Sequence, residues 1–285
     1  MSKYNIQHYE NFPVASWLCP AKLRPAVCAI YHYARTADDI ADEGTASAPE
    51  RLCQLHSYRL ALMQTIEHNL SNVPPQWAWI FQPLHQAIIQ YQIPPNLLLQ
   101  LLDAFEQDIH NPTYATRMEL LHYCERSANP IGRLMLHLYG INNPAFLKQS
   151  DAICSALQLI NFWQDLQIDL GRNRCYIPVA DLDRFELQRH QLQPGLVQPT
   201  LVPLMEELVA WARTLMHEGA SLATKLSGRF GWELRFVVQG GLRILEKIHQ
   251  NQYQCLIQRP KIHTWDAPVL AWRILLMSYR HREPY

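Results

Sequence analysis

The sequence predicts an all-α protein in which residues 1–285 form a single domain, and three observations carry that prediction. Apolar residues recur at spacings of three and four along most of the chain, which is the pattern of amphipathic helices. Glycine is sparse, with 10 residues, whereas most of the 19 prolines fall between the periodic segments, where they end one helix or begin the next. Alternating strand patterns are nearly absent, and no linker interrupts the chain.

Taken in order, the periodic segments predict helices whose ends are uncertain by about 2–4 residues. They span residues 21–41, 49–71, 76–92, 95–110, 116–140, 144–170, 201–226, 231–251 and 266–280. The one long stretch of weak periodicity is 171–200. Loops of that length are often functional, so we expect it to act as a lid or binding segment.

Composition excludes several classes of protein. The net charge is +0, from 25 basic and 25 acidic side chains, which argues against a nucleic-acid partner and against a polybasic membrane contact. The seven cysteines are scattered singly without a C-x-x-C, so neither a disulfide framework nor a zinc knuckle is predicted. The N-terminus lacks an apolar signal region, and no apolar run is long enough to cross a bilayer. We therefore expect a cytoplasmic protein and leave open a peripheral contact with the inner face of the membrane.

A polar stripe runs through the first predicted helix, around A-R-T-A-D-D-I-A-D-E-G at 34–44. Tyr31, Arg35, Asp38 and Asp42 are spaced four, three and four residues apart, so they share one face of a helix. Apolar residues occupy much of the remaining surface. We therefore expect the stripe to face an enclosed cavity rather than bulk water.

A second stripe follows the same design in I-C-S-A-L-Q-L-I-N-F-W-Q-D-L-Q-I-D-L. Gln158, Asn161, Asp165 and Asp169 fall at spacings of three, four and four, among leucines, isoleucines and aromatic residues. The sequence thus predicts a second buried helix that carries two carboxylates one turn apart.

Carboxylates in apolar surroundings cost several kcal/mol each unless they are compensated. Mg²⁺ prefers oxygen ligands and commonly takes one or two carboxylates together with phosphate oxygens, so two such stripes favour a diphosphate held by Mg²⁺. Arg35, Arg172 and Arg174 would suit that anion. Two alternatives are weighed. One is an ordinary solvated acidic face, and the other is a pair of irons, which would require paired Glu-x-x-His motifs. The pair Glu246 and His249 is interpreted as a surface contact.

Four segments carry a resemblance to a known family: Y-H-Y-A-R-T-A-D-D-I-A-D, Y-C-E-R-S-A-N-P-I-G, Q-L-I-N-F-W-Q-D-L-Q-I-D and R-C-Y-I-P. At these residues the chain resembles the squalene/phytoene synthases, and the resemblance covers almost the whole chain. More narrowly, H-Y-E-N-F-P-V-A-S (8–16) and S-A-N-P-I-G-R-L-M-L-H-L-Y-G (127–140) resemble the hydroxysqualene synthases of bacterial hopanoid biosynthesis.

The resemblance implies an isoprenoid-synthase-like helical bundle around a deep apolar channel, with Mg²⁺ and diphosphate held at its mouth. Carried over by position, the metal ligands are Asp38, Asp42, Asn161, Asp165 and Asp169. The substrate-binding positions are His8, Tyr31, Arg35, Gln158, Asn161, Arg174, Tyr176 and Tyr253. The catalytic positions are Tyr123, Asp38, Asp42, Asp165 and Asp169. Asp39 lies off the stripe and is a weaker candidate, and Asp108 fits a further position of the family.

The function implied is Mg²⁺-dependent ionisation of presqualene diphosphate, followed by rearrangement and capture by water to give hydroxysqualene. Gln164 and Ile168 stand where many relatives carry charged residues, which favours a site for one diphosphate. The alternative within the family is head-to-head condensation of two prenyl diphosphates such as farnesyl diphosphate. A helical interaction protein without chemistry is the alternative outside it. The resemblance also leaves open a hand-off to other enzymes of the squalene and hopanoid pathway.

Overall fold

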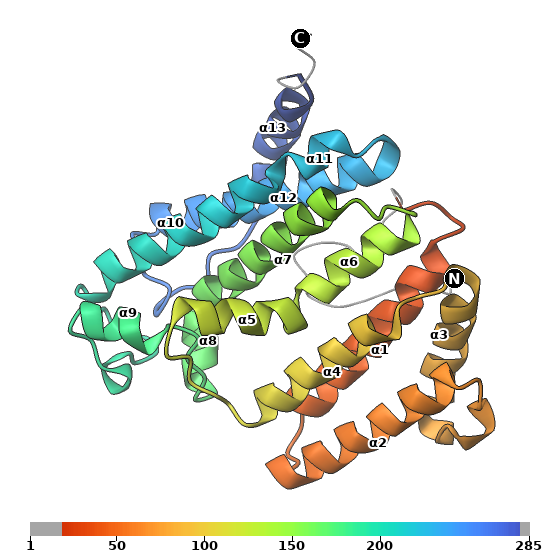
Figure 1. Ribbon diagram of the computed structural model, residues 1–285. Helices are drawn as coiled ribbons and strands as arrows, with labels where there is room; N and C mark the ends of the chain where they lie inside the picture. Colours follow the sequence, from red (N-terminus) through yellow and green to blue (C-terminus); the bar gives the residue numbers. More distant parts are fainter. Residues whose placement is uncertain (1–18, 280–285) are drawn as a thin grey trace. The chain divides into compact units, whose positions relative to one another are not determined.

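The computed structural model describes residues 19–279, and all regular structure in that range is helical (Figure 1), which confirms the predicted fold class. No described helix combines the length and the apolar character that a membrane span requires. The α-helices are α1 Arg24–Asp42, α2 Ala48–Ile66, α3 Ala78–Tyr91, α4 Pro95–Ile109, α5 Arg117–Ser127, α6 Asn129–Leu138, α7 Pro144–Gln164, α8 Leu166–Gly171, α9 Val179–Arg184, α10 Leu201–Ala220, α11 Leu222–Lys225, α12 Gly228–Gln250 and α13 Ala267–Tyr279. Short 3₁₀ turns are η1 Leu70–Asn72, η2 Pro75–Trp77, η3 Arg189–Gln191 and η4 Thr264–Asp266.

The chain divides into two compact units. The first is formed by Met1–Asn111 with Pro130–Asn142, and the second by Pro112–Asn129 with Asn143–Tyr285. The two acidic stripes therefore belong to different units, and each is described within its own unit. The prediction of one domain with a deep apolar channel stays a prediction.

The first unit is built around α1, which packs against α2, α3 and α4. Its centre is a group of fully buried aromatic rings, in which Tyr33 stacks on Tyr58 at 5.6 Å between centroids. The Tyr58 hydroxyl donates to the Tyr33 carbonyl at 3.1 Å, and the Tyr33 hydroxyl donates to the Leu98 carbonyl at 2.9 Å. Because buried hydroxyls must find acceptors, these bonds fix the rotation of α1 about its axis. With Tyr33 and Ala37 turned to the core, the polar stripe of α1 lies away from it.

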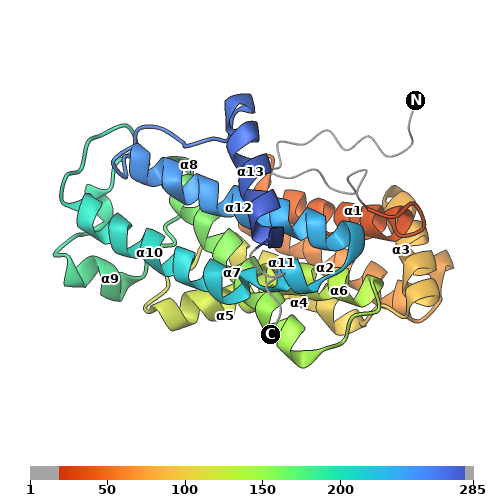
Figure 2. The same ribbon diagram turned by 90° about the horizontal axis from the view of Figure 1, so that it is seen from above.

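The second unit is dominated by α7 and α10, which run side by side, with α12 packed on both (Figure 2). Trp163 is fully buried on α7. The α7–α10 approach is close at Gly219, where an added Cβ would lie 2.5 Å from Ile153 Cγ1 and would also meet the Gln149 carbonyl oxygen. Only glycine lets the two backbones pack at this distance.

Three predicted helices are each divided in two. Residues 116–140 form α5 and α6 with a break at Ala128, residues 144–170 form α7 and α8 with a break at Asp165, and residues 201–226 form α10 and α11 with a break at Ser221. Each interruption is a single residue, and so apolar periodicity, which averages over whole turns, does not show it.

Gly219→Ala should destabilise the protein by about 1–3 kcal/mol, because the added methyl group overpacks the α7–α10 contact. Gly171→Ala is the matched control: Gly171 lies in α8, and an added Cβ there would meet nothing within 4 Å. The control should be neutral or should stabilise by about 0.5 kcal/mol through reduced backbone entropy of the unfolded state. Chemical denaturation of both variants measures the difference, and equal stabilities would contradict the close approach.

Candidate functional site

The first stripe lies on one uninterrupted helix. Tyr31, Arg35, Asp38 and Asp42 all belong to α1, and all four are partly exposed, so the prediction that they share a helix face is confirmed. The expectation that the stripe faces an enclosed cavity rather than bulk water is not met at Asp38, whose side chain is 41% exposed. The Tyr31 ring contacts His32 edge to face, with 5.6 Å between centroids.

Arg35 is the electrostatic centre of this stripe. Its guanidinium contacts Asp38 Oδ2 at 2.9 Å, Asp39 Oδ1 at 2.7 Å and Glu43 Oε1 at 2.8 Å. Burial alone would lower the pKa of Arg35, but these carboxylates raise it above its ordinary value overall. One cation thus compensates three acids. A cluster of this kind, rich in carboxylate oxygens, has the donor chemistry that suits a hard cation such as Mg²⁺.

The second stripe spans a break between two helices. Gln158 and Asn161 lie on α7, Asp169 lies on α8, and Asp165 is the residue between them. The helical hydrogen bonds nevertheless continue: the Asp165 N–H donates to the Asn161 carbonyl at 2.8 Å, and the Asp169 N–H donates to the Asp165 carbonyl at 2.9 Å. The one-turn spacing of the polar residues is therefore kept.

The prediction that this second helix is buried is wrong at two positions. Asn161 is exposed, and so is Ile168, at 43%. Gln158, Asp165 and Asp169 are partly exposed. Asn161 and Ile168 therefore lie off the buried face of this helix.

Arg259 is the partner of Asp165, and sequence reasoning missed it. The guanidinium donates through Nε to Oδ1 and through Nη2 to Oδ2, the latter at 3.1 Å, in a two-pronged ion pair. Both side chains are 26% exposed. Such bidentate pairs are stronger and more directional than single contacts. The two residues are 94 positions apart, so no local pattern could have paired them.

Gln164 has a structural role that the sequence did not suggest. Its side chain is fully buried, and its Nε2 donates to the Pro260 carbonyl at 2.6 Å. This bond holds the backbone directly beside Arg259. The nearby Cys255 thiol is buried, and burial, with a smaller contribution from the Asp165 carboxylate, raises its pKa to about 12, so that thiol stays protonated.

Four aromatic rings gather beside the second stripe. Phe162 and Tyr176 stack face to face, with 3.7 Å between centroids and 9° between planes. Tyr123 lies 6.2 Å from each of them, and Tyr114 lies 5.5 Å from Tyr123. The structure thus brings together Tyr123 and Tyr176, two of the predicted site residues, next to the polar positions of α7. We call Tyr114, Tyr123, Phe162 and Tyr176 the aromatic cluster.

The segment 171–200 is more ordered than the sequence predicts. It contains the short helix α9 and the turn η3, and it buries apolar side chains at Cys175, Ile177, Leu182, Leu187 and Leu192. Arg174 is partly buried, and its backbone N–H donates to the backbone carbonyl of Asp169 at 2.7 Å. A six-residue helix is too short to produce a readable periodic pattern, which is why the sequence predicted only a loop.

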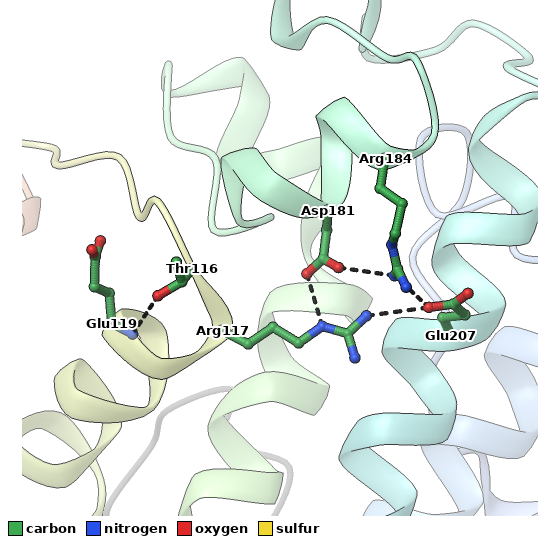
Figure 3. A network of polar contacts seen from close by, with 6 residues as sticks. All are labelled: Thr116, Arg117, Glu119, Asp181, Arg184 and Glu207. Atoms are coloured by element: carbon green, nitrogen blue, oxygen red, sulfur yellow. Dashed lines mark hydrogen bonds and ion pairs between the residues drawn. The ribbon is translucent and has the colours of Figure 1, made fainter.

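An ion-pair network holds α9 in place (Figure 3). Asp181 is buried and accepts hydrogen bonds from Arg117 at 2.8 Å and from Arg184 at 3.0 Å. Both arginines also contact Glu207 on α10, and Arg117 lies 5.1 Å from the ring centroid of Trp211. The segment that contains Arg174 and Tyr176 is therefore attached to α5 through the buried Asp181 and to α10 through Glu207.

The remaining predicted residues lie as follows. The Tyr253 hydroxyl is hydrogen-bonded to His249 Nδ1 at 2.8 Å, and burial is the main cause that raises its pKa. The Asn129 side chain, which follows Tyr123 on the next helix, accepts from the Ser155 hydroxyl at 3.0 Å. Asp108 is partly buried on α4 in the first unit. His8 falls outside the described residues. The roles assigned to these side chains stay predictions.

Between residues 19 and 279, no three side chains of His, Cys, Asp or Glu come close enough together to form a metal centre by themselves. The Glu-x-x-His spacing also occurs at Glu119 and His122. Glu119 accepts the Ala115 N–H at 2.7 Å, and the His122 side chain is 64% exposed. This pair forms part of a helix start.

Comparisons with known proteins point in one direction. The sequence pattern of the family described as squalene/phytoene synthase matches residues 6–266. The chain is 32% identical to a hydroxysqualene synthase of Rhodopseudomonas palustris over 241 residues, which covers 84% of this chain and 79% of that one. It is 29% identical to a phytoene synthase of Thermus thermophilus over 273 residues, covering 95% and 90%.

Solved structures agree. A crystal structure of the squalene synthase HpnC from Alicyclobacillus acidocaldarius matches with a TM-score of 0.76 and 30% identity, covering 86% of this chain and 90% of that one. A dehydrosqualene synthase matches with a TM-score of 0.80 and 21% identity, covering 94% of this chain and 91% of that one, a likeness of fold. The resemblance predicted from the sequence motifs is thereby confirmed.

Asp181→Asn should loosen α9 and speed proteolytic cleavage within 171–200 by at least about threefold, because the neutral amide binds Arg117 and Arg184 less strongly than the carboxylate does. Asp183→Asn is the matched control, since Asp183 lies exposed on the same helix. Limited proteolysis with mass-spectrometric mapping gives the rates. If the two variants are cleaved at the same rate as the unaltered protein, the network does not restrain the segment.

Proposed function

The chain belongs to the squalene/phytoene synthase family, enzymes that act on prenyl diphosphates, and we propose that it converts presqualene diphosphate into hydroxysqualene. The likeness to two hydroxysqualene synthases, each at 32% identity over 84% of the chain, supports this choice within the family. The reaction consumes one water and releases diphosphate. No electrons are gained or lost overall, so no reductant is required.

One observation carries the proposal. In the second unit, the polar stripe and the aromatic cluster are adjacent on the same helix, because Asn161 and Phe162 are consecutive residues of α7. An exposed polar position that can contact an anionic leaving group thus lies beside buried aromatic rings. That is the arrangement needed to break a carbon–oxygen bond heterolytically, with diphosphate leaving toward one side and a carbocation remaining on the other.

The oxygen donors of the two stripes fit Mg²⁺. Asp38 and Asp42 in the first unit, and Asn161, Asp165 and Asp169 in the second, supply carboxylate and amide oxygens, the ligands this ion prefers. When bound, Mg²⁺ supplies positive charge that stabilises the departing diphosphate.

Arg35 and Arg259 contact these acids and are also the proposed ligands of the diphosphate. Each already contacts carboxylates through its guanidinium, and each has N–H groups in the planar geometry that matches phosphate oxygens. We expect these arginines to pass from carboxylate to diphosphate contacts when substrate enters. Tyr31 and Gln158 share the stripes as further donors, and His8, Arg174, Tyr176 and Tyr253 are proposed diphosphate contacts from the family resemblance.

The aromatic cluster serves the cation. After the carbon–oxygen bond breaks, the cyclopropylcarbinyl cation must rearrange before water reaches it. Aromatic faces attract cations by about 1–2 kcal/mol each, and the rings of Tyr123, Phe162 and Tyr176 also keep water out. Water then adds its oxygen to the allylic cation and loses a proton, which leaves the hydroxyl of the product.

Condensation of two prenyl diphosphates is the second candidate, and the likeness to phytoene synthases favours it. The residues next to Asp165 and Asp169 argue against it. Gln164 carries no charge and uses its amide on the Pro260 carbonyl, and Ile168 presents an exposed apolar side chain. The second stripe therefore has less charge available for two diphosphates.

The product identifies the reaction. We expect purified protein with Mg²⁺ to consume presqualene diphosphate quickly and farnesyl diphosphate slowly or not at all. In water labelled with an oxygen isotope, the product's hydroxyl oxygen should carry the label, because water adds to the allylic cation. Addition of NADPH should change neither the rate nor the product. Mass spectrometry of the extracted lipid gives the result. Squalene formed only with NADPH, or a phytoene-like product from longer diphosphates, would contradict the proposal.

A further inference from the structure

In helix α13 the charged side chain faces the protein and large apolar side chains face solvent, which is the reverse of an ordinary surface helix. It packs on α12 within the second unit (Figure 1), and from Ala267 to Met277 its one charged residue is Arg273. Arg273 is directed toward α12, where its guanidinium donates to Glu246. Ile274, which is 2% exposed, lies on the same inner side. The only charged side chain of this helix is thus bonded within the protein and is not on the outer side.

The outer side of this helix is apolar. Trp265 in the preceding turn η4 is 69% exposed, and Trp272 is 64% exposed. Val269, Leu275 and Leu276 are also exposed. Trp265, Val269, Trp272 and Leu276 are spaced four, three and four residues apart, so they form one continuous strip. We call these five residues the α13 face.

Scattered exposed apolar residues are ordinary, but a contiguous strip with two tryptophans is not. A surface helix normally shows charged residues to solvent, and this one shows none on its outer side. The α13 face therefore indicates a surface that is covered when the protein works.

A cationic cleft borders the strip and indicates what covers it. The cleft has a volume of about 580 Å³, and its lining includes Lys247, Arg259, Lys261 and His263. The His263 ring stacks on Trp265 at 4.2 Å between centroids, and Lys247 Nζ lies 6.0 Å from the centre of the same ring. Trp265 therefore joins the cleft to the α13 face.

The carboxylates at this border are already compensated. Asp266 is completely buried and contacts Lys247 at 2.8 Å and Arg243 at 2.7 Å. Burial by itself would raise the pKa of Asp266, but hydrogen bonds from the His263 N–H, Lys247 and Arg243 lower it to about 2. Lys261 makes no ion pair with a carboxylate of the described residues, so the border keeps positive charge for a ligand.

We propose that the α13 face docks on a lipid bilayer that contains anionic phospholipids, with headgroup phosphates at Lys247, Lys261 and His263. Tryptophan beside basic residues is typical of the membrane interface, where the ring lies at headgroup level. At 13 residues, α13 would lie along the surface, because about 20 residues are needed to cross the hydrocarbon. A second copy fits less well, since a symmetric contact would bring two cationic clefts together.

Vesicle co-sedimentation tests this proposal without substrate, so it can fail independently of the proposed reaction. The unaltered protein should bind vesicles of phosphatidylcholine with phosphatidylglycerol, and should bind phosphatidylcholine vesicles more weakly. Trp265→Ala with Trp272→Ala should weaken binding about tenfold or more, because two large apolar groups no longer enter the bilayer. Lys261→Gln should weaken binding to the anionic vesicles alone, and added salt should reduce that difference.

Trp79→Ala is the matched control, because Trp79 is 58% exposed on α3 in the other unit. It should bind vesicles like the unaltered protein, and circular dichroism should show all variants folded. As a second measurement, lipids brominated along their chains should quench tryptophan fluorescence of the unaltered protein, and less so in Trp272→Phe. Absence of vesicle binding would overturn the proposal. A dimer that dissociates on Trp272→Ala, without vesicle binding, would assign the α13 face to a second copy instead.

Discussion

Acidic side chains set into apolar helices need positive charge close by, and the arrangement of this protein's site depends on that requirement. In water-poor surroundings an uncompensated carboxylate costs several kcal/mol or takes up a proton. Here Arg35 holds Asp38 together with two further acids, and Arg259 holds Asp165 with both prongs of its guanidinium. Each arginine holds its carboxylates in place while leaving them partly accessible. We propose that these carboxylates bind a divalent cation and that the arginines bind the anion that accompanies it.

The sequence predicted those features of the fold and the site that depend on local hydrophobic and polar patterns. The all-helical fold, the positions of most helices and the sharing of one face by Tyr31, Arg35 and Asp38 all follow from 3.6-residue periodicity. The aromatic side of the site was only half predicted: Tyr123 and Tyr176 came from the family resemblance, but their contact with Phe162 is a property of the folded unit.

What could not be predicted depends on long-range contact or on single residues. Arg259 meets Asp165 across 94 positions, and no helix period relates them. The sequence pattern indicates a weakened motif at Gln164, yet the Gln164 side chain bonds to the Pro260 carbonyl and holds the backbone beside Arg259. The break at Asp165 occupies one residue, so the apolar pattern runs through it without a signal. Nor does periodicity reveal that Asp181 ties α9 to its neighbours. These are the features that turn a pattern of helices into a specific site.

The central claim is that the acidic stripes serve metal and diphosphate, with the arginines as their resting partners. Calorimetric titration with inorganic diphosphate, with and without Mg²⁺, tests it on the unaltered protein, on Asp165→Asn and on Arg259→Gln. We expect diphosphate to bind only with Mg²⁺, and each substitution to weaken that binding about tenfold or more while the helical fold is kept. Diphosphate binding that needs no Mg²⁺, or that neither substitution alters, would mean that these residues form only a surface ion pair, and would contradict the claim.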